Sequence, residues 1–389
     1  MKKILIIGAG FLQDFVIQKA KELGYYTIAI DGSPEAIGLQ HADKSAVVNI
    51  VDEKACYEYA KKRDIDGVLT VATDYGVLSA SYVAEKLGLP GLKYETAKRI
   101  KNKYEVRRRL IDTEVDDTHE AYEVGSKTAL DDLIIHYPVM VKPCDGSGSR
   151  ATRRVDCFEE LKGACEDAVK TSRIRKALIE DFVTGHEYGA ESIVVNGEVF
   201  VLGIMKKWMT DPPYYAELGH QIPSELPDTI EQKVRKCVEN AIKALEINHG
   251  AVNMDLIISP SGDVHIIDVG ARMGGNMIGP CVIPIGTGIA YMDNLIRIAV
   301  SDEPDWSVIS QQKVCTRLLA FKGGRVNKLP DFKSIEEKYN VKIYHHMNPG
   351  DFVNEYHTNL DGCGYIIAGD AATADRVLSE IAEYVKQEG

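Results

Sequence analysis

The sequence predicts an α/β and α+β protein that begins with a doubly wound parallel sheet. Residues 1–95 alternate apolar runs with amphipathic stretches, which is typical of parallel strands joined by helices. Later parts of the chain show strand–turn–strand patterns, and Asn196-Gly197 is the strongest signal because this pair suits a two-residue hairpin turn. A chain of 389 residues is long enough for about two to three domains.

The first 95 residues supply the elements of the parallel sheet. The run Lys3–Ile7 is continuously apolar, as expected for a strand buried on both faces. Leu89–Gly91 is expected to lead into a short last strand. The other strands are expected at Tyr26–Ile30, Ala46–Val48 and Gly67–Val71, and the helices at Phe11–Leu23, Lys54–Arg63 and Val77–Leu87.

The rest of the chain is expected to mix helices with antiparallel strands. Residues 96–110 are basic and helical in pattern, whereas Asp211–Pro227 holds four prolines and predicts a long functional loop. The last helix is expected at Thr373–Lys386. Further helices are expected at Phe158–Lys170 and Thr229–Leu245, and strands at Pro138–Pro143, Ala177–Phe182, Tyr188–Val195, Glu198–Leu202, Ala251–Ile258, Asp263–Val269, Cys315–Phe321, Lys342–His346 and Gly364–Ile367.

Composition narrows the class of protein. Hydrophobic residues make up 45% and charged residues 27%, which is ordinary for a soluble globular chain. The formal net charge of −12 disfavours binding to nucleic acid, and no apolar run reaches the roughly 18 residues of a membrane span. The eight cysteines show no C-x-x-C spacing and are expected to be reduced thiols. We therefore expect a cytoplasmic protein without nucleic-acid or membrane partners.

The first glycine motif is an incomplete dinucleotide fingerprint. Gly8-Ala9-Gly10 follows a strand and opens a helix, and Asp31 ends the next strand. Gln13 occupies the place of the third glycine, which allows close packing of helix on strand in NAD-binding proteins. An NAD-dependent dehydrogenase is therefore kept only as a disfavoured alternative.

A phosphate-binding loop is predicted after residue 143. Lys142 ends a strand, and Asp145–Arg150 contains two glycines and two serines. Backbone N–H groups and hydroxyls in such a loop can hold phosphate oxygens, and the lysine adds a positive charge. The loop lacks the G-K-[ST] pattern of a P-loop, and a simple turn is the alternative.

Two glutamates follow at the end of a later strand. The strand containing Glu180 can present backbone groups to an adenine edge, and Glu187 can bind ribose hydroxyls. The alternative is that both are solvated glutamates near a turn. These two glutamates indicate nucleotide binding only when they are considered together with the other motifs.

Two aspartates lie on a predicted hairpin. With the turn centred on Pro260-Ser261, Asn253 faces Asp268, and Asp255 is the diagonal neighbour at about 7–8 Å between Cα atoms. Two carboxylates at this separation can converge on Mg²⁺ together with phosphate oxygens and water. A register slip of one residue would separate them, and exposed aspartates are the alternative. Both lie among apolar residues, where an unpaired charge is costly.

In order and spacing these motifs resemble the ATP-grasp ligases over nearly the whole chain. The resemblance rests on Lys103, Lys142, the Asp145–Arg150 loop, Glu180 with Glu187, Asp255, and the run from Asp268 to Arg272. The chain looks most like the biotin-carboxylase-like branch, including amino-acid ligases and carbamoyl-phosphate-synthase-like proteins. The resemblance implies a pre-ATP-grasp Rossmann-like domain at 1–97, an ATP-grasp domain at 98–306 with a small nucleotide lid subdomain at about 112–185, and a C-terminal α+β region at 307–389.

The resemblance also implies roles for individual residues. Arg272 would stabilise the reacting centre, and Asp255 and Asp268 would hold Mg²⁺, with Mn²⁺ as a substitute. The family usually has Glu and Asn where this chain has Asp268 and Gly270, and Asn253 or Asn276 is a candidate to replace the missing amide. The residues implied to bind ATP are Lys103, Lys142, Ser147, Gly148, Ser149, Glu180, Phe182, Val183 and Glu187.

The reaction implied by the resemblance joins a carboxylate to an amine. The acid would attack ATP to give an acyl phosphate and ADP, and a small-molecule amine would displace phosphate. The alternatives are a carboxylase acting through carboxyphosphate and a degenerate, non-catalytic nucleotide-binding protein; a homodimer is one candidate assembly. Asp74 is expected at the substrate, with a helix N-cap as its alternative. His220 and Asn276 are further substrate candidates.

Overall fold

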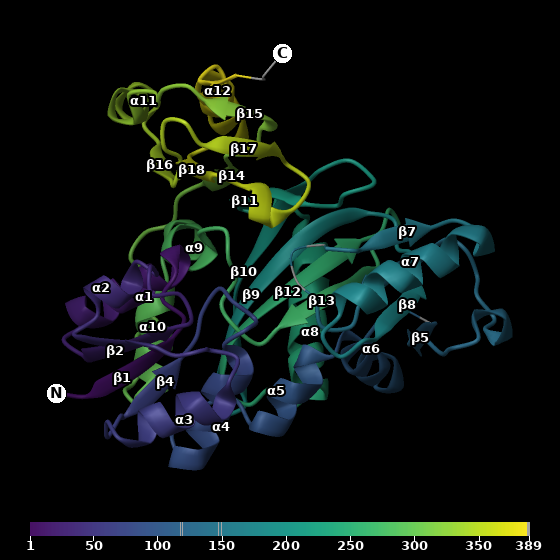
Figure 1. The fold of residues 1–389 in the computed structure, drawn as a ribbon, viewed down its shortest axis with the longest axis horizontal. Helices are drawn as coiled ribbons and strands as arrows, with labels where there is room; N and C mark the ends of the chain where they lie inside the picture. The colour runs from purple at the N-terminus through teal and green to yellow at the C-terminus, as the bar shows by residue number, and fades with distance from the viewer. Residues whose placement is uncertain (117, 119, 147, 149, 387–389) are drawn as a thin grey trace.

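The computed structural model describes residues 1–116, 118, 120–146, 148 and 150–386. Figure 1 shows a parallel sheet near the N-terminus, a long central sheet beside it, a smaller lobe carrying α7 (Phe158–Thr171), and a C-terminal region above the central sheet. The mixed α/β architecture predicted from the sequence is confirmed. Within the described residues, no helix has both the length and the apolar character needed to cross a membrane.

The N-terminal sheet is parallel with strand order β3-β2-β1-β4. The short last strand expected after Leu89–Gly91 is wrong. Pro90 has no N–H to donate, and a Cβ at Gly91 would lie 2.7 Å from the Ala84 Cβ, so this segment packs against a helix instead of pairing. The strands are β1 (Lys3–Ile7), β2 (Tyr26–Asp31), β3 (Lys44–Val47) and β4 (Gly67–Leu69), and the helices are α1 (Phe11–Glu22), α2 (Gly38–His41), α3 (Glu53–Lys61) and α4 (Val77–Leu87).

The central sheet has eight strands, and every pair in it is antiparallel. Asn196 and Gly197 both have positive φ, which confirms the predicted hairpin turn. In sheet order the strands are β13 (Val264–Gly270), β12 (Gly250–Ile258), β9 (His186–Val195), β10 (Glu198–Met209), β11 (Glu217–Ile222), β14 (Val314–Leu318), β18 (Gly364–Ala368) and β16 (Lys342–His345).

Strand β11 corrects the prediction that Asp211–Pro227 is one long loop. The prolines of this segment flank the strand and do not interrupt it. β11 pairs with β10 on one side and β14 on the other, and a Cβ at Gly219 would lie 2.0 Å from the Thr316 carbonyl oxygen. Residues 219–222 are also buried, so this part of the strand has no exposed polar face and its sequence carries little periodicity.

One hydrophobic core fixes the N-terminal sheet against the central sheet. It joins Ile4 and Val16 to Leu202, Met273 and Leu295. Helix α8 (Asp228–Ala244) packs against β9, β10, β12 and β13 of the central sheet in a second hydrophobic core. Helices α5 (Tyr94–Lys101) and α6 (Lys103–Asp112) lead into the small lobe, and η2 (Ile278–Val282), α9 (Ile283–Thr287) and α10 (Tyr291–Ala299) follow β13.

The small lobe is an antiparallel sheet packed on α7 (Figure 1). Its strands, in sheet order, are β5 (Ala121–Val124), β8 (Ala177–Asp181), β6 (Val139–Pro143) and β7 (Arg153–Val155), with η1 (Leu130–Asp132) after β5. It lies within the range predicted for the nucleotide lid subdomain.

The C-terminal region adds a small second sheet, β17-β15-β19. The last helix ends at Ala382, earlier than the predicted Lys386, because Val385 leaves the helix to pair with Val326. The remaining elements are β15 (Lys322–Val326), α11 (Phe332–Tyr339), β17 (Phe352–Glu355), η3 (Asn359–Asp361), α12 (Ala371–Ala382) and β19 (Val385–Lys386).

Candidate active site

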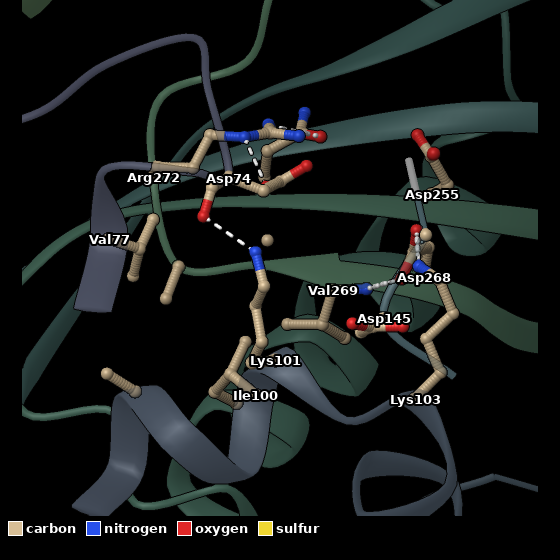
Figure 2. A pocket seen from close by; sticks show the side chains of 15 residues that line it. Asp74, Val77, Ile100, Lys101, Lys103, Asp145, Asp255, Asp268, Val269 and Arg272 are labelled. Carbon is tan, nitrogen blue, oxygen red and sulfur yellow. Dashed lines mark hydrogen bonds and ion pairs between the residues drawn. The ribbon is translucent and has the colours of Figure 1, made fainter. Parts of the chain in front are cut away.

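A polar pocket opens where the N-terminal sheet, helix α5 and the β12–β13 hairpin meet (Figure 2). Its charged side chains come from segments far apart in the sequence. The residues that line it are Asp74, Val77, Ala97, Ile100, Lys101, Lys103, Asp145, Gly146, Asn253, Asp255, Asp268, Val269, Gly270, Ala271 and Arg272.

The two hairpin aspartates lie directly opposite each other. Asp255 pairs with Asp268, and Asn253 faces Gly270, so the predicted pairing of Asn253 with Asp268 is wrong. A bulge between Asp255 and Leu256 and a five-residue loop, closed by a 2.9 Å bond from Ser259 N to Asp263 O, shift the register. Opposite residues of an antiparallel pair share a face, so both carboxylates still project to the same side.

Lysines neutralise both hairpin carboxylates. The Lys103 ammonium pairs with Asp268, and the Lys207 ammonium lies 2.8 Å from Asp255. Burial raises the pKa of Asp268, but attraction to Lys103 and Lys142 outweighs it and lowers that pKa to about 2. Asp268 is therefore held as an anion, and Asp255 has the Lys207 ammonium in direct contact.

The pair fits Mg²⁺ in its donor chemistry. Two carboxylates on one face suit a hard cation that takes its other ligands from phosphate oxygens and water. Within the described residues, no three His, Cys, Asp or Glu side chains gather as a metal-binding group.

Glu180 anchors the positions of two cations. Its carboxylate is buried and accepts from the Lys142 ammonium at 2.5 Å and from Arg107 Nε at 2.8 Å. Lys142 also donates to the Ile267 carbonyl at 2.9 Å, which holds its ammonium beside the β13 strand. Arg107, which the sequence reasoning missed, pairs with Asp116 as well and completes a buried network.

The other residues implied to bind ATP are only partly placed. Ser147 and Ser149 lie outside the described residues, and Gly148 has a φ of +68° with open space where a Cβ would be. Phe182 follows β8, with the Arg154 guanidinium 4.6 Å from its ring centre, and Val183 comes next at the start of the turn to β9.

A buried lysine gathers three carboxylates that the sequence reasoning did not connect. The Lys207 side chain is 3% exposed, and its ammonium lies 2.8 Å from Asp255, 3.3 Å from Glu187 and 3.6 Å from Glu217. Burial alone would lower the pKa of Lys207, but attraction to the carboxylates raises it well above its ordinary value. Lys207 therefore links the predicted metal ligand Asp255 to the predicted ribose ligand Glu187.

The two substrate candidates from the later chain meet at Glu217. His220 Nε2 contacts one carboxylate oxygen of Glu217, and Asn276 Nδ2 donates to the other at 2.8 Å. Burial raises the pKa of Glu217, yet Lys207 and His220 lower it below its ordinary range. Glu217 is thus a buried carboxylate between His220, Asn276 and Lys207.

Arg272 is held by Asp74. Its Nε donates to Asp74 Oδ1 at 2.9 Å, and the N-cap of α4 is Gly76, which rules out the alternative that Asp74 caps this helix. A Cβ at Gly270 would lie 3.1 Å from Arg272 Cζ, so the guanidinium fills the space beside Gly270. Asn253 and Asn276 bond to Glu191 and Glu217 respectively, and neither bonds to Asp268.

Glu191 braces the loop that follows Arg272. This fully buried carboxylate accepts from Gly274 N at 2.9 Å, from Asn253 Nδ2 at 2.8 Å and from the Tyr291 hydroxyl at 2.5 Å. Burial raises the pKa of Glu191 to about 7. Glu191 lies in an apolar strand, two residues before Ile193-Val194-Val195. This apolar setting was the signal in the sequence that could have revealed a buried charge.

The glycine turn of β1 carries contacts that disfavour a dinucleotide. Gln13 Nε2 donates to the Val71 carbonyl at 2.7 Å, and its side chain lies 2.9 Å from the place of a Cβ on Gly10. Asp31 accepts from Ala9 N at 2.7 Å and so stabilises the turn itself. Gln13 and Asp31 therefore both form hydrogen bonds within the N-terminal region.

Comparison with known proteins agrees with this geometry. The family model of the ATP-grasp domain matches residues 135–280, which contain β6, the loop after it and the β12–β13 hairpin. This stretch of the chain is similar to an ATP-grasp domain. It holds Lys142, Glu180, Asp255, Asp268 and Arg272.

Relatives extend the likeness beyond this domain. Phosphoribosylglycinamide synthetase from Anaerococcus prevotii is 25% identical with a TM-score of 0.77, and 100% of each chain is covered. L-amino acid ligase from Bacillus licheniformis is 23% identical with a TM-score of 0.86, covering 100% of this chain and 99% of that one. The uncharacterized protein y4rH of Sinorhizobium fredii is 23% identical over 336 residues, or 84% of this chain and 68% of that protein.

Proposed function

We propose that this ATP-grasp protein is an ADP-forming ligase that activates a carboxylate as an acyl phosphate and joins it to an amine. The observation that carries the proposal is the convergence of Lys103, Asp268, Asp255 and Arg272 on one pocket. Mg²⁺ is the proposed metal, with Mn²⁺ as a substitute. We place the reaction in the cytoplasm, where ATP is abundant; a homodimer stays a prediction.

ATP is proposed to lie between the small lobe and the β12–β13 hairpin. Lys142 and Lys103 would hold the phosphates, and the backbone of Glu180–Val183 would contact adenine, since both oxygens of the Glu180 carboxylate are already bonded. Glu187 would bind the ribose. Asp255 and Asp268 would hold the metal, which supplies positive charge to the phosphates of the bound nucleotide.

Nucleotide binding would change the partners of the ion pairs in the pocket. When nucleotide binds, Lys103 can turn from Asp268 to a phosphate, which frees the carboxylate for the metal. Arg272 can turn from Asp74 to stabilise the negative charge that develops when the acid attacks the γ-phosphate. Glu217, with His220 and Asn276 beside it, offers a carboxylate for the ammonium group of a substrate.

The decisive measurement is the fate of ATP. We expect a panel of carboxylic acids to contain at least one that releases ADP and phosphate, and hydroxylamine to trap the activated acid as a hydroxamate. Release of AMP and pyrophosphate would contradict an acyl-phosphate route. ADP release stimulated only by bicarbonate, with no hydroxamate, would instead identify the carboxylase alternative.

Nucleotide selectivity gives a second prediction. Calorimetric titration should show binding of a non-hydrolysable ATP analogue with Mg²⁺ and none of NAD, because Gln13 and Asp31 are bonded within the N-terminal turn. The matched control is Gln13→Gly, which restores the third glycine and should leave the affinity for the ATP analogue unchanged. Tight binding of NAD without binding of the ATP analogue would refute the ligase proposal.

A further inference from the structure

Lys101 forms no ion pair with any carboxylate of the described residues, unlike the other basic side chains that line the pocket, and Asp74 and Asp145 attract it only without contact. Lys103 pairs with Asp268, and Arg272 pairs with Asp74. The Lys101 ammonium donates to the backbone carbonyl of Asp74 at 2.9 Å. Among the described residues, no carboxylate oxygen forms an ion pair with it. The pocket therefore holds one positive charge that its own acidic side chains do not neutralise directly.

The position of this lysine is central. Figure 2 shows the Lys101 side chain rising from the end of α5 into the pocket, with Asp74 and Arg272 on one side and Lys103 and Asp268 on the other. Burial lowers the pKa of Lys101 below its ordinary value. A desolvated ammonium recovers part of its lost hydration energy when an anion binds beside it, so the geometry favours an anionic ligand.

The surroundings of Lys101 extend this positive character toward the surface. Its ammonium lies 5.4 Å from the centre of the Tyr75 ring, and the Arg173 guanidinium lies 4.6 Å from the same centre. Arg150 donates to the Tyr75 hydroxyl at 3.2 Å. The acidic group on this side, Asp145, accepts from Arg173 N and from a neighbouring hydroxyl. Three cations thus surround one tyrosine between the pocket and the outside.

We propose that Lys101 binds a second anionic group, a carboxylate or a phosphate, on the acid that is activated. The inference rests on the proposed ligase function. In that function Lys103 and Lys142 serve the triphosphate and Arg272 serves the reacting carboxyl group, which leaves the Lys101 charge unassigned. The substrate then carries at least two negative charges, and its distal group points toward Tyr75.

The competing explanation is that Lys101 is one more ligand of the ATP phosphates. The two explanations differ in what removal of the charge does. A nucleotide ligand lowers the affinity for ATP when it is lost, whereas a ligand of the distal group leaves that affinity unchanged. Lys101→Met removes the charge and keeps most of the side-chain volume. Lys98→Met is the matched control, because Lys98 lies on the same helix and pairs with Glu95 at the surface.

The test is calorimetric titration of the full chain in three steps. The first step measures the affinity for AMP-PNP with Mg²⁺, and failure of the unaltered protein to bind it would refute the proposed function itself. With AMP-PNP and Mg²⁺ saturating, the second step titrates acetate, malonate and inorganic phosphate. The third step repeats both titrations with Lys101→Met, Lys101→Arg and Lys98→Met.

We expect malonate or phosphate to bind at least tenfold more tightly than acetate, and the stronger of the two identifies the distal group. Lys101→Met should abolish this preference and leave the AMP-PNP affinity unchanged, while Lys101→Arg and Lys98→Met should retain it. Equal affinity for the three anions, a preference that survives in Lys101→Met, or a tenfold loss of AMP-PNP affinity in that variant would each overturn the inference. None of these outcomes depends on whether the ligase reaction occurs.

Discussion

Asp268→Asn is expected to lower kcat by at least 100-fold while the protein stays folded. The substitution keeps the size of the side chain and removes the charge that Lys103 now balances and that the metal would require. Loss of one preorganised electrostatic group in an active site costs about 10²–10³ in rate. The Asp268 side chain is 39% exposed, so its ion pair should contribute no more than about 1 kcal/mol to stability.

The measurement is ADP release at saturating ATP and Mg²⁺, with thermal unfolding as the test of folding. Asp263→Asn is a matched control, because Asp263 lies at the end of the same hairpin and pairs with Lys233 at the surface. The control should keep full activity. Full activity in Asp268→Asn would show that the metal is held elsewhere, and a tenfold higher Mg²⁺ requirement would show that the charge acts through the metal.

Local sequence patterns were sufficient for most of the fold. The apolar run of β1 and the Asn196-Gly197 turn each depend on the chemistry of adjacent residues, so both were predicted. Strand β11 was missed because its stability comes from pairing with β14, which is distant in the sequence. The end of α12 was missed for the same reason, since Val385 pairs with Val326 on another strand.

The candidate site was predictable where order and spacing identify a motif. The sequence indicated Asp255 and Asp268 as neighbours but gave the wrong register, because a bulge leaves no mark in residue type. Lys207 was missed, although side chains point to alternate faces along β10 and Lys207 therefore shares a face with the buried Met205. Three carboxylates from three other strands explain its burial, and only the tertiary structure brings them together.

Lys207→Met is expected to destabilise the protein by about 3–5 kcal/mol at neutral pH, because removal of one member of a buried ionic cluster leaves its partners uncompensated. The variant would bury Asp255, Glu187 and Glu217 around an apolar side chain. Urea unfolding followed by tryptophan fluorescence measures the loss. Lys206→Met is the matched control, since Lys206 is the next residue and pairs with Glu225 at the surface; we expect it to cost less than about 1 kcal/mol.

The destabilisation by Lys207→Met should shrink as the pH falls, and the sign follows from two carboxylates. Lys207 helps to lower the pKa of Glu217, so Glu217 stabilises the unaltered protein above its ordinary pKa, and this contribution disappears as acid protonates it. Burial already raises the pKa of Glu187, and loss of Lys207 should raise it further. As the pH falls, Glu187 of the variant should therefore be protonated early, which removes part of the destabilisation. The difference in unfolding free energy between the two proteins should therefore be largest near pH 7.5 and clearly smaller near pH 4.5. A difference that stays constant over this range would mean that Lys207 stabilises the fold by packing and not by its charge.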